Sequence, residues 1–153
     1  MVNRRLATVN GGIFPNSAEK LAELPGIGRS TAAAIAAFSF GRKAAILDGN
    51  VKRVLCRQFG IAGFPGTKAV HDRLWALADS LLPDSDIEVY TQGLMDLGAT
   101  LCTRSRPRCG ECPLAAECVA RRDGRQGELP EAKPRAAVPE RTSGFVLLTD
   151  GQR

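Results

Sequence analysis

The stretch LPGIGRSTAAAI, residues 24–35, contains the turn on which the fold depends. A short helix is expected just before it, over residues 17–24, with Ser17 as its N-cap, and it must end at PGIG. An alanine-rich helix is expected just after it, over residues 29–40. A G-x-G turn between two helices leaves backbone N–H groups and the positive end of the second helix facing outward, so it predicts a cradle for phosphate. The same pattern also fits a plain helix–helix connection.

The rest of the chain continues the helical pattern. Apolar spacing predicts helices over residues 51–61, 67–83 and 86–102. Gly93 and Gly98 interrupt the last of these and would allow close packing or approach at some cost in helix stability. No alternating strand pattern occurs before residue 145, and no internal repeat is detected. The expected fold class is therefore all-α.

Size and charge narrow the class of protein. The chain has 153 residues with 44% apolar content, which suits about one domain with its own core. Its net charge is +5 and its pI about 9.2, and arginines recur near residues 104–108 and 121–125, which suits a polyanionic partner such as nucleic acid. The N-terminus shows no apolar signal region and no window is long enough to cross a membrane, so we expect a cytoplasmic protein with no membrane partner.

Four cysteines lie within CTRSRPRCGECPLAAEC, residues 102–118, with the spacing C-x6-C-x2-C-x5-C. Disulfides are disfavoured in a reducing compartment. Structural zinc usually takes two close pairs, and only one C-x2-C pair is present. The spacing therefore favours an iron–sulfur cluster over zinc, with a metal-free loop as a third alternative. The arginines between the thiols are expected on an exposed loop facing phosphates; they are Arg104, Arg106 and Arg108.

The stretch ILDGNVKRV, residues 46–54, carries a candidate catalytic carboxylate. Asp48 precedes a predicted helix, so it also fits a simple N-cap. Lys52 lies about one turn further on and could approach Asp48 or a phosphate. Asn50 could orient the carboxylate or a bound water.

Three other residues are expected to be structural. Cys56 lies on the apolar side of its helix and should pack in the core rather than act as a fifth ligand. Trp75 is expected in the core rather than as a wedge between bases. His71, the only histidine, is expected at the surface.

Over about residues 10–142 the chain closely resembles the adenine DNA glycosylase family. The resemblance rests on three stretches in this order: LPGIGRSTAAAI, ILDGNVKRVL, and MDLGATLCTRSRPRC with its cysteine spacing. The family belongs to the helix-hairpin-helix base-excision glycosylases, which flip a nucleotide out of the duplex. The resemblance implies a 4Fe-4S cluster and, as partner, double-stranded DNA with A opposite 8-oxoguanine or guanine. A monomer is expected.

The resemblance also implies roles for particular residues. The catalytic carboxylate would be Asp48, with Asn50 and Lys52 beside it. The DNA-binding hairpin would comprise Pro25, Gly26, Gly28, Arg29 and Ser30. The cluster ligands would be Cys102, Cys109, Cys112 and Cys118.

Ser30 separates two branches of the resemblance. Endonuclease-III-like enzymes carry a lysine at this position to form a Schiff base with the sugar. A serine there predicts a monofunctional glycosylase, although Lys52 could still trap an abasic sugar. An endonuclease-III-like glycosylase and a non-catalytic DNA-binding module are the alternatives.

The chain also departs from the family. The family protonates adenine with a glutamate upstream of the hairpin, and neither Glu19 nor Glu23, the only acidic residues before Asp48, matches it. We therefore expect a fragment: a partial helical glycosylase domain over residues 1–100, a cluster loop over 101–122, and a linker with the start of a Nudix-like domain over 123–153, including a strand over 145–151. Adenine excision by such a fragment alone is expected to be very slow or absent.

Overall fold

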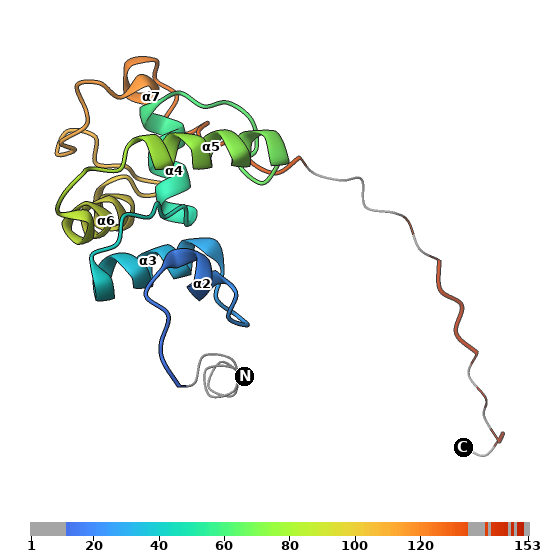
Figure 1. The fold of residues 1–153 in the computed structure, drawn as a ribbon. Coiled ribbons are helices and arrows are strands. Elements are labelled where there is room, and N and C mark those ends of the chain that lie inside the picture. The colour runs from blue at the N-terminus through green and yellow to red at the C-terminus, as the bar shows by residue number, and fades with distance from the viewer. Residues whose placement is uncertain (1–11, 135–139, 141, 147, 149, 152–153) are drawn as a thin grey trace.

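A computed structural model describes residues 12–134, 140, 142–146, 148 and 150–151. The described chain is all-α, as predicted, and Figure 1 shows its helices packed into one body from which the C-terminal segment extends. The helices are α2 (Ala18–Ala22), α3 (Arg29–Phe40), α4 (Gly49–Gln58), α5 (Lys68–Ser80), α6 (Ile87–Asp96) and α7 (Val119–Arg122), and a π-helix, η1 (Leu97–Leu101), continues α6.

The two helices of the hairpin form where the sequence predicts them. The Ser17 hydroxyl accepts a hydrogen bond from the N–H of Lys20 and caps α2. Gly26 has φ +85°, a left-handed conformation that a glycine adopts without strain, and it turns the chain toward α3. Gly41, with φ +58°, ends α3. The hairpin is therefore built from local capping and turn chemistry.

Helix α4 lies near the centre of the body and packs against α5, α6, η1 and α7 (Figure 1). Its residues Val51 and Leu55 are buried and pack in one cluster with Ala33 of α3 and Leu74 of α5. Burial of such a stripe is the main term that stabilises helices of this length. Because α4 is the shared packing partner, its N-terminus is held in a defined place.

Gly98 brings η1 against the start of α4. A Cβ built on Gly98 would lie 2.7 Å from the Cβ of Asn50 and 3.2 Å from its backbone carbon, so only glycine allows this approach. A Cβ on Gly93 would meet no atom within 4 Å of the described structure. The close packing expected of the two glycines is confirmed at Gly98 and is not found at Gly93.

The packed body extends beyond the boundary expected at residue 122. Leu129 is 1% exposed, and its carbonyl accepts a hydrogen bond from Arg57 of α4. The extended chain begins after this anchor (Figure 1). The described residues of 145–151 form no strand, and 147 and 149 lie outside the described residues. A lone strand has no partner for its backbone hydrogen bonds.

None of the helices in the described part of the chain is long and apolar enough to cross a membrane.

Candidate functional site

The hairpin turn presents open backbone at the start of α3. Gly28 is the N-cap of α3 and supplies no side-chain cap, so the first N–H groups of the helix keep their donors for another partner. Gly26 and Gly28 are both exposed, and a Cβ on either would meet no described atom within 4 Å. The turn therefore offers free donors, a favourable helix dipole and open space in front.

Ser30 ties this hairpin to the segment that carries Asp48. Its hydroxyl accepts a hydrogen bond of 2.9 Å from the N–H of Leu47. Leu47 is buried and directly precedes Asp48. Ser30, the residue that distinguishes the two branches of the resemblance, thus holds the backbone directly before the candidate carboxylate in place.

Asp48 is the N-cap of α4, as its simpler interpretation predicted. Its Oδ1 accepts a hydrogen bond of 2.8 Å from the N–H of Val51. No described group donates to Oδ2, and the residue is half-buried. Capping therefore fixes the orientation of the carboxylate and leaves one oxygen available to a ligand.

Asn50 is held by an arginine that the sequence analysis did not single out. Arg53 donates to Asn50 Oδ1 at 2.8 Å, to the carbonyl of Gly98 at 2.6 Å and to the carbonyl of Cys102 at 2.7 Å. Burial lowers the pKa of the Arg53 guanidinium below its usual value. Asn50 is thus bonded to Arg53, and Arg53 connects the start of α4 to the first cysteine of the loop.

Lys52 is not bonded to Asp48 in the described structure. It lines a groove at the side of α4 together with Arg104 and Lys133. Glu128 and Glu131 line the same groove, so Lys52 shares it with charges of both signs.

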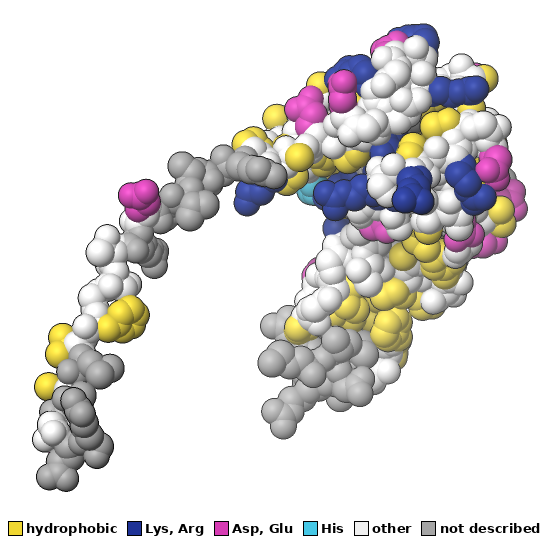
Figure 2. All heavy atoms as spheres, turned by 180° about the vertical axis from the view of Figure 1, so that it is seen from behind, with side chains coloured by type: hydrophobic (Ala, Val, Ile, Leu, Met, Phe, Trp, Pro, Cys, Tyr) yellow, Lys and Arg dark blue, Asp and Glu magenta, His cyan; other side chains and the backbone are white. Residues whose placement is uncertain are grey.

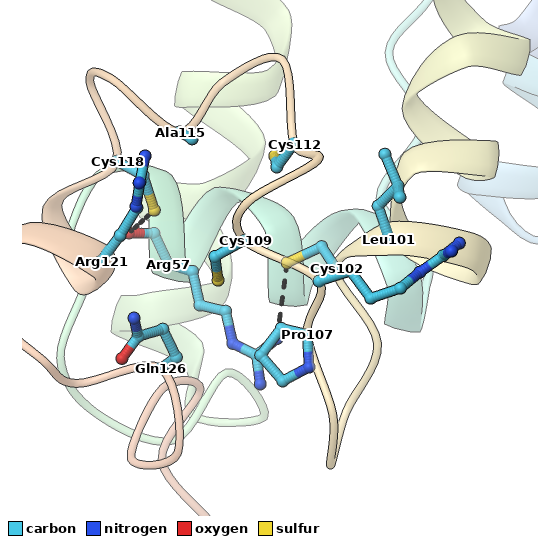
Figure 3. Close-up of a pocket in the computed structure, with 11 residues that line it drawn as sticks. Arg57, Leu101, Cys102, Pro107, Cys109, Cys112, Ala115, Cys118, Arg121 and Gln126 are labelled. Atoms are coloured by element: carbon cyan, nitrogen blue, oxygen red, sulfur yellow. Dashed lines mark hydrogen bonds between the residues drawn. The ribbon is translucent and has the colours of Figure 1, made fainter.

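The four cysteines of the loop face one cavity, shown in Figure 3. Within the described residues, no three His, Cys, Asp or Glu side chains are placed to hold a single metal ion, yet all four thiols line the same cavity. Four thiols that share one cavity without forming a single-ion site fit a cluster of several metals better than a zinc ion. Leu101, Pro107 and Ala115 form the apolar part of the rest of the wall, and its polar part comes from Arg57, Arg108, Arg121 and Gln126.

Arg57 organises this cavity, and the sequence analysis missed it. It is 3% exposed and donates to the carbonyls of Leu129 (2.8 Å), Thr103 (2.7 Å) and Arg104 (2.9 Å). Its Nη1 also lies 3.4 Å from the sulfur of Cys102 (Figure 3). An arginine directly after the apolar run VLC, residues 54–56, was the only sequence signal for this role.

The loop arginines lie where the sequence analysis placed them, at the surface. Arg104, Arg106 and Arg108 are exposed. Arg108 pairs with Glu111 and donates to the carbonyl of Thr100, whereas no described group pairs with the side chains of Arg104 and Arg106. Figure 2 shows several lysine and arginine side chains on the visible face of the body, with acidic and apolar side chains between them. The loop thus carries cations that remain available to a polyanion.

Cys56 and Trp75 lie in the core as expected, whereas His71, which was expected at the surface, is only partly exposed. Cys56 is fully buried, and burial raises the pKa of its thiol to about 11. Trp75 is 9% exposed and belongs to the core. His71 is half-buried and meets the edge of the Trp75 ring, with the ring centroids 6.1 Å apart.

Two family models match the segments described above. The helix-hairpin-helix motif matches residues 10–38, and the iron–sulfur binding domain of endonuclease III matches residues 102–122, which contain all four cysteines. The second match confirms the expectation of an iron–sulfur cluster in this loop.

Sequence relatives cover most of the chain. It is 39% identical over 137 residues to adenine DNA glycosylase of Buchnera aphidicola subsp. Acyrthosiphon pisum (strain APS), a match of 90% of this chain and 39% of that protein. It is 42% identical over 127 residues to adenine DNA glycosylase of Homo sapiens, a match of 82% of this chain and 23% of that protein. The chain thus spans less than half the length of these relatives.

Solved structures share the fold. A thermostable thymine-DNA glycosylase superposes with a TM-score of 0.70 at 33% identity, covering 78% of this chain and 55% of that one. Endonuclease III in a non-covalent DNA complex gives a TM-score of 0.64 at 25% identity, covering 79% and 55%. With the hairpin, the cysteine loop and these relatives in agreement, the chain is a helix-hairpin-helix protein with an iron–sulfur loop, and over most of its length it is similar to adenine DNA glycosylases.

Proposed function

We propose that this chain is the DNA-binding and cluster-bearing part of an adenine DNA glycosylase of base-excision repair. The observation that carries the proposal is the hydrogen bond from the Leu47 N–H to the Ser30 hydroxyl. It joins the open turn at Gly26 and Gly28 to the segment ending at Asp48. A duplex whose phosphate is held by the turn therefore has its sugar close to the carboxylate.

Asp48 acts on the sugar of the flipped deoxyadenosine. As the bond between adenine and deoxyribose breaks, its electron pair leaves with the base and positive charge develops on the sugar. The free oxygen of Asp48 stabilises that charge, and the stabilisation is largest in the transition state. Because the N-cap hydrogen bond to Val51 orients the carboxylate beforehand, little reorganisation is needed during the reaction.

Water, rather than a lysine, completes the reaction in this proposal. Ser30 is engaged with Leu47 and is no amine, so it cannot form a Schiff base at the position where endonuclease-III-like enzymes carry lysine. Lys52 is assigned to phosphate contact in the groove beside α4. The leaving adenine needs a proton donor, and neither Glu19 nor Glu23 is proposed for that role.

The cluster ligands are Cys102, Cys109, Cys112 and Cys118, and the proposed group is a 4Fe-4S cluster. When bound, the cluster cross-links the loop and can exchange electrons. The chain's own contribution is Arg57, which holds the loop carbonyls beside the first ligand. The ordered loop then presents Arg104 and Arg106 to phosphates.

The proposed substrate is duplex DNA with A opposite 8-oxoguanine or guanine, bound by a monomer in the cytoplasm. Thymine excision is a second candidate, because the solved thymine-DNA glycosylase is similar to this chain at 33% identity and a TM-score of 0.70. The adenine relatives favour adenine, since they are similar over up to 90% of the chain.

Single-turnover cleavage tests the proposal. The iron-loaded chain and a chimera that adds the preceding segment of the human relative are given duplexes with A opposite 8-oxoguanine or T opposite G. We expect both proteins to bind, and the chimera to cut the first duplex faster than the chain alone. Asp48→Asn in the chimera should abolish cutting while leaving binding. If the chimera binds but cuts neither duplex, the enzyme assignment fails and a binding module remains.

A further inference from the structure

Arg29, the first residue of α3, is already held by two side chains of α5. Its guanidinium carbon lies 3.7 Å from the centroid of the Trp75 ring. Its Nη2 donates to Asp79 Oδ2 at 2.9 Å. The Arg29 and Asp79 side chains are 57% and 47% exposed, so this pair lies at the surface next to the hairpin turn.

Trp75 gives the arginine a rigid support. The ring is 9% exposed and packs in the core cluster, and His71 meets it edge-on at an interplanar angle of 81°. A guanidinium over the face of an indole is attracted by the ring electrons. Because the ring is anchored, the charge of Arg29 is kept beside the start of α3.

That place is next to the phosphate cradle. Arg29 directly follows Gly28, the N-cap that offers its helix no side-chain acceptor. A phosphate at the turn would therefore lie within reach of the Arg29 guanidinium, which has five N–H donors and pairs with one carboxylate, that of Asp79, in the described structure. The Asp79 carboxylate on the same guanidinium would repel that phosphate.

We propose that Asp79 occupies Arg29 in the free protein as a substitute for a DNA phosphate, and that duplex binding replaces the carboxylate with the phosphate while Trp75 supports the arginine. The inference rests on the proposed DNA binding by the hairpin. An exposed ion pair is weak, so the exchange costs little and is reversible. Asp79 therefore lowers the affinity of the chain for DNA.

A double-mutant cycle on the iron-loaded chain tests this, with a short undamaged duplex at low salt as the probe. We expect Asp79→Asn to tighten binding about two- to fivefold, the factor that an exposed ion pair can supply. In an Arg29→Gln background, Asp79→Asn should change the affinity for the duplex no more than the loss of one negative charge from α5 does. Asp72→Asn is the matched control: it removes the same charge from α5, where Asp72 pairs with Lys68 of its own helix, and its effect should not depend on Arg29.

The outcomes separate the inference from the function on which it rests. An Asp79 effect that disappears without Arg29 supports the exchange. An equal effect in both backgrounds shows that Asp79 contributes only its charge, and weaker binding by Asp79→Asn shows that it positions Arg29 for DNA; either result overturns the inference. If the unchanged chain does not bind the duplex, the proposed DNA binding itself fails. Circular dichroism and iron content confirm that each variant is folded.

Discussion

Replacing Arg57 by methionine should destabilise the cysteine loop more than any other single arginine change in the body. Methionine fills much of the same buried space but removes every donor. Three carbonyls, those of Leu129, Thr103 and Arg104, then lose their hydrogen bonds of 2.7 to 2.9 Å. The substitution therefore weakens both the end of the packed chain and the start of the loop, because both are held by this one side chain.

The magnitude follows from the contacts. A hydrogen bond from a charged donor contributes about 1.5–3 kcal/mol, so three give an upper bound of roughly 5–9 kcal/mol. The loop can move and rehydrate the freed carbonyls, so we expect about 3–5 kcal/mol, close to the cost of breaking a buried charged network. A domain of this kind is stable by roughly 5–15 kcal/mol in total, so the variant should be marginal.

Urea unfolding and the iron and sulfide content of the purified protein measure this effect. Arg73→Met is the control, since Arg73 is exposed on α5 and makes no hydrogen bond in the described structure. Arg57→Lys keeps the charge but not the planar fork and should be intermediate. If Arg57→Met retains its iron and unfolds at the same urea concentration as Arg73→Met, the organising role of Arg57 is refuted.

Three further predictions follow from close contacts and burial. Gly98→Ala should lower the free energy of unfolding by about 1–3 kcal/mol, because its Cβ would lie 2.7 Å from the Cβ of Asn50. Gly93→Ala, whose Cβ would meet no described atom within 4 Å, should leave that free energy unchanged or raise it by up to about 1 kcal/mol, and chemical denaturation measures both variants. Ser30→Ala should slow adenine excision by the chimera while duplex affinity stays within about twofold, and Ser30→Thr should restore the rate; equal losses of rate and affinity would count against a positioning role. The pKa of buried Cys56 is raised from 9.0 to about 11, so its neutral thiol contributes fully to stability below pH 9, and this contribution, roughly 2–3 kcal/mol, is lost between pH 9 and 11. The free energy of unfolding, measured at several pH values, should therefore decline less steeply for Cys56→Ala than for the unchanged chain.

The parts of the fold that sequence predicted are those that depend on near neighbours. Ser17, Gly26 and Gly28 act within one turn of the chain, so the hairpin was visible in LPGIGRSTAAAI. The N-cap role of Asp48 involves Val51, three residues away. The boundaries moved where such signals were absent: the last turn of the helix over 86–102 is a π-helix, and α7 after Cys118 was not predicted.

The sequence by itself determined the all-α class, the hairpin and the iron–sulfur loop, because capping, turn and ligand spacing are local properties of the chain. Only the tertiary structure decided which partners the arginines take. Arg29 meets Asp79 fifty residues away, and Arg57 meets Leu129 seventy-two residues away. Such pairs depend on how α3 lies beside α5 and how the segment at Leu129 packs on α4. An arginine in an amphipathic helix has the same local signature whether it faces water, a phosphate or several buried carbonyls.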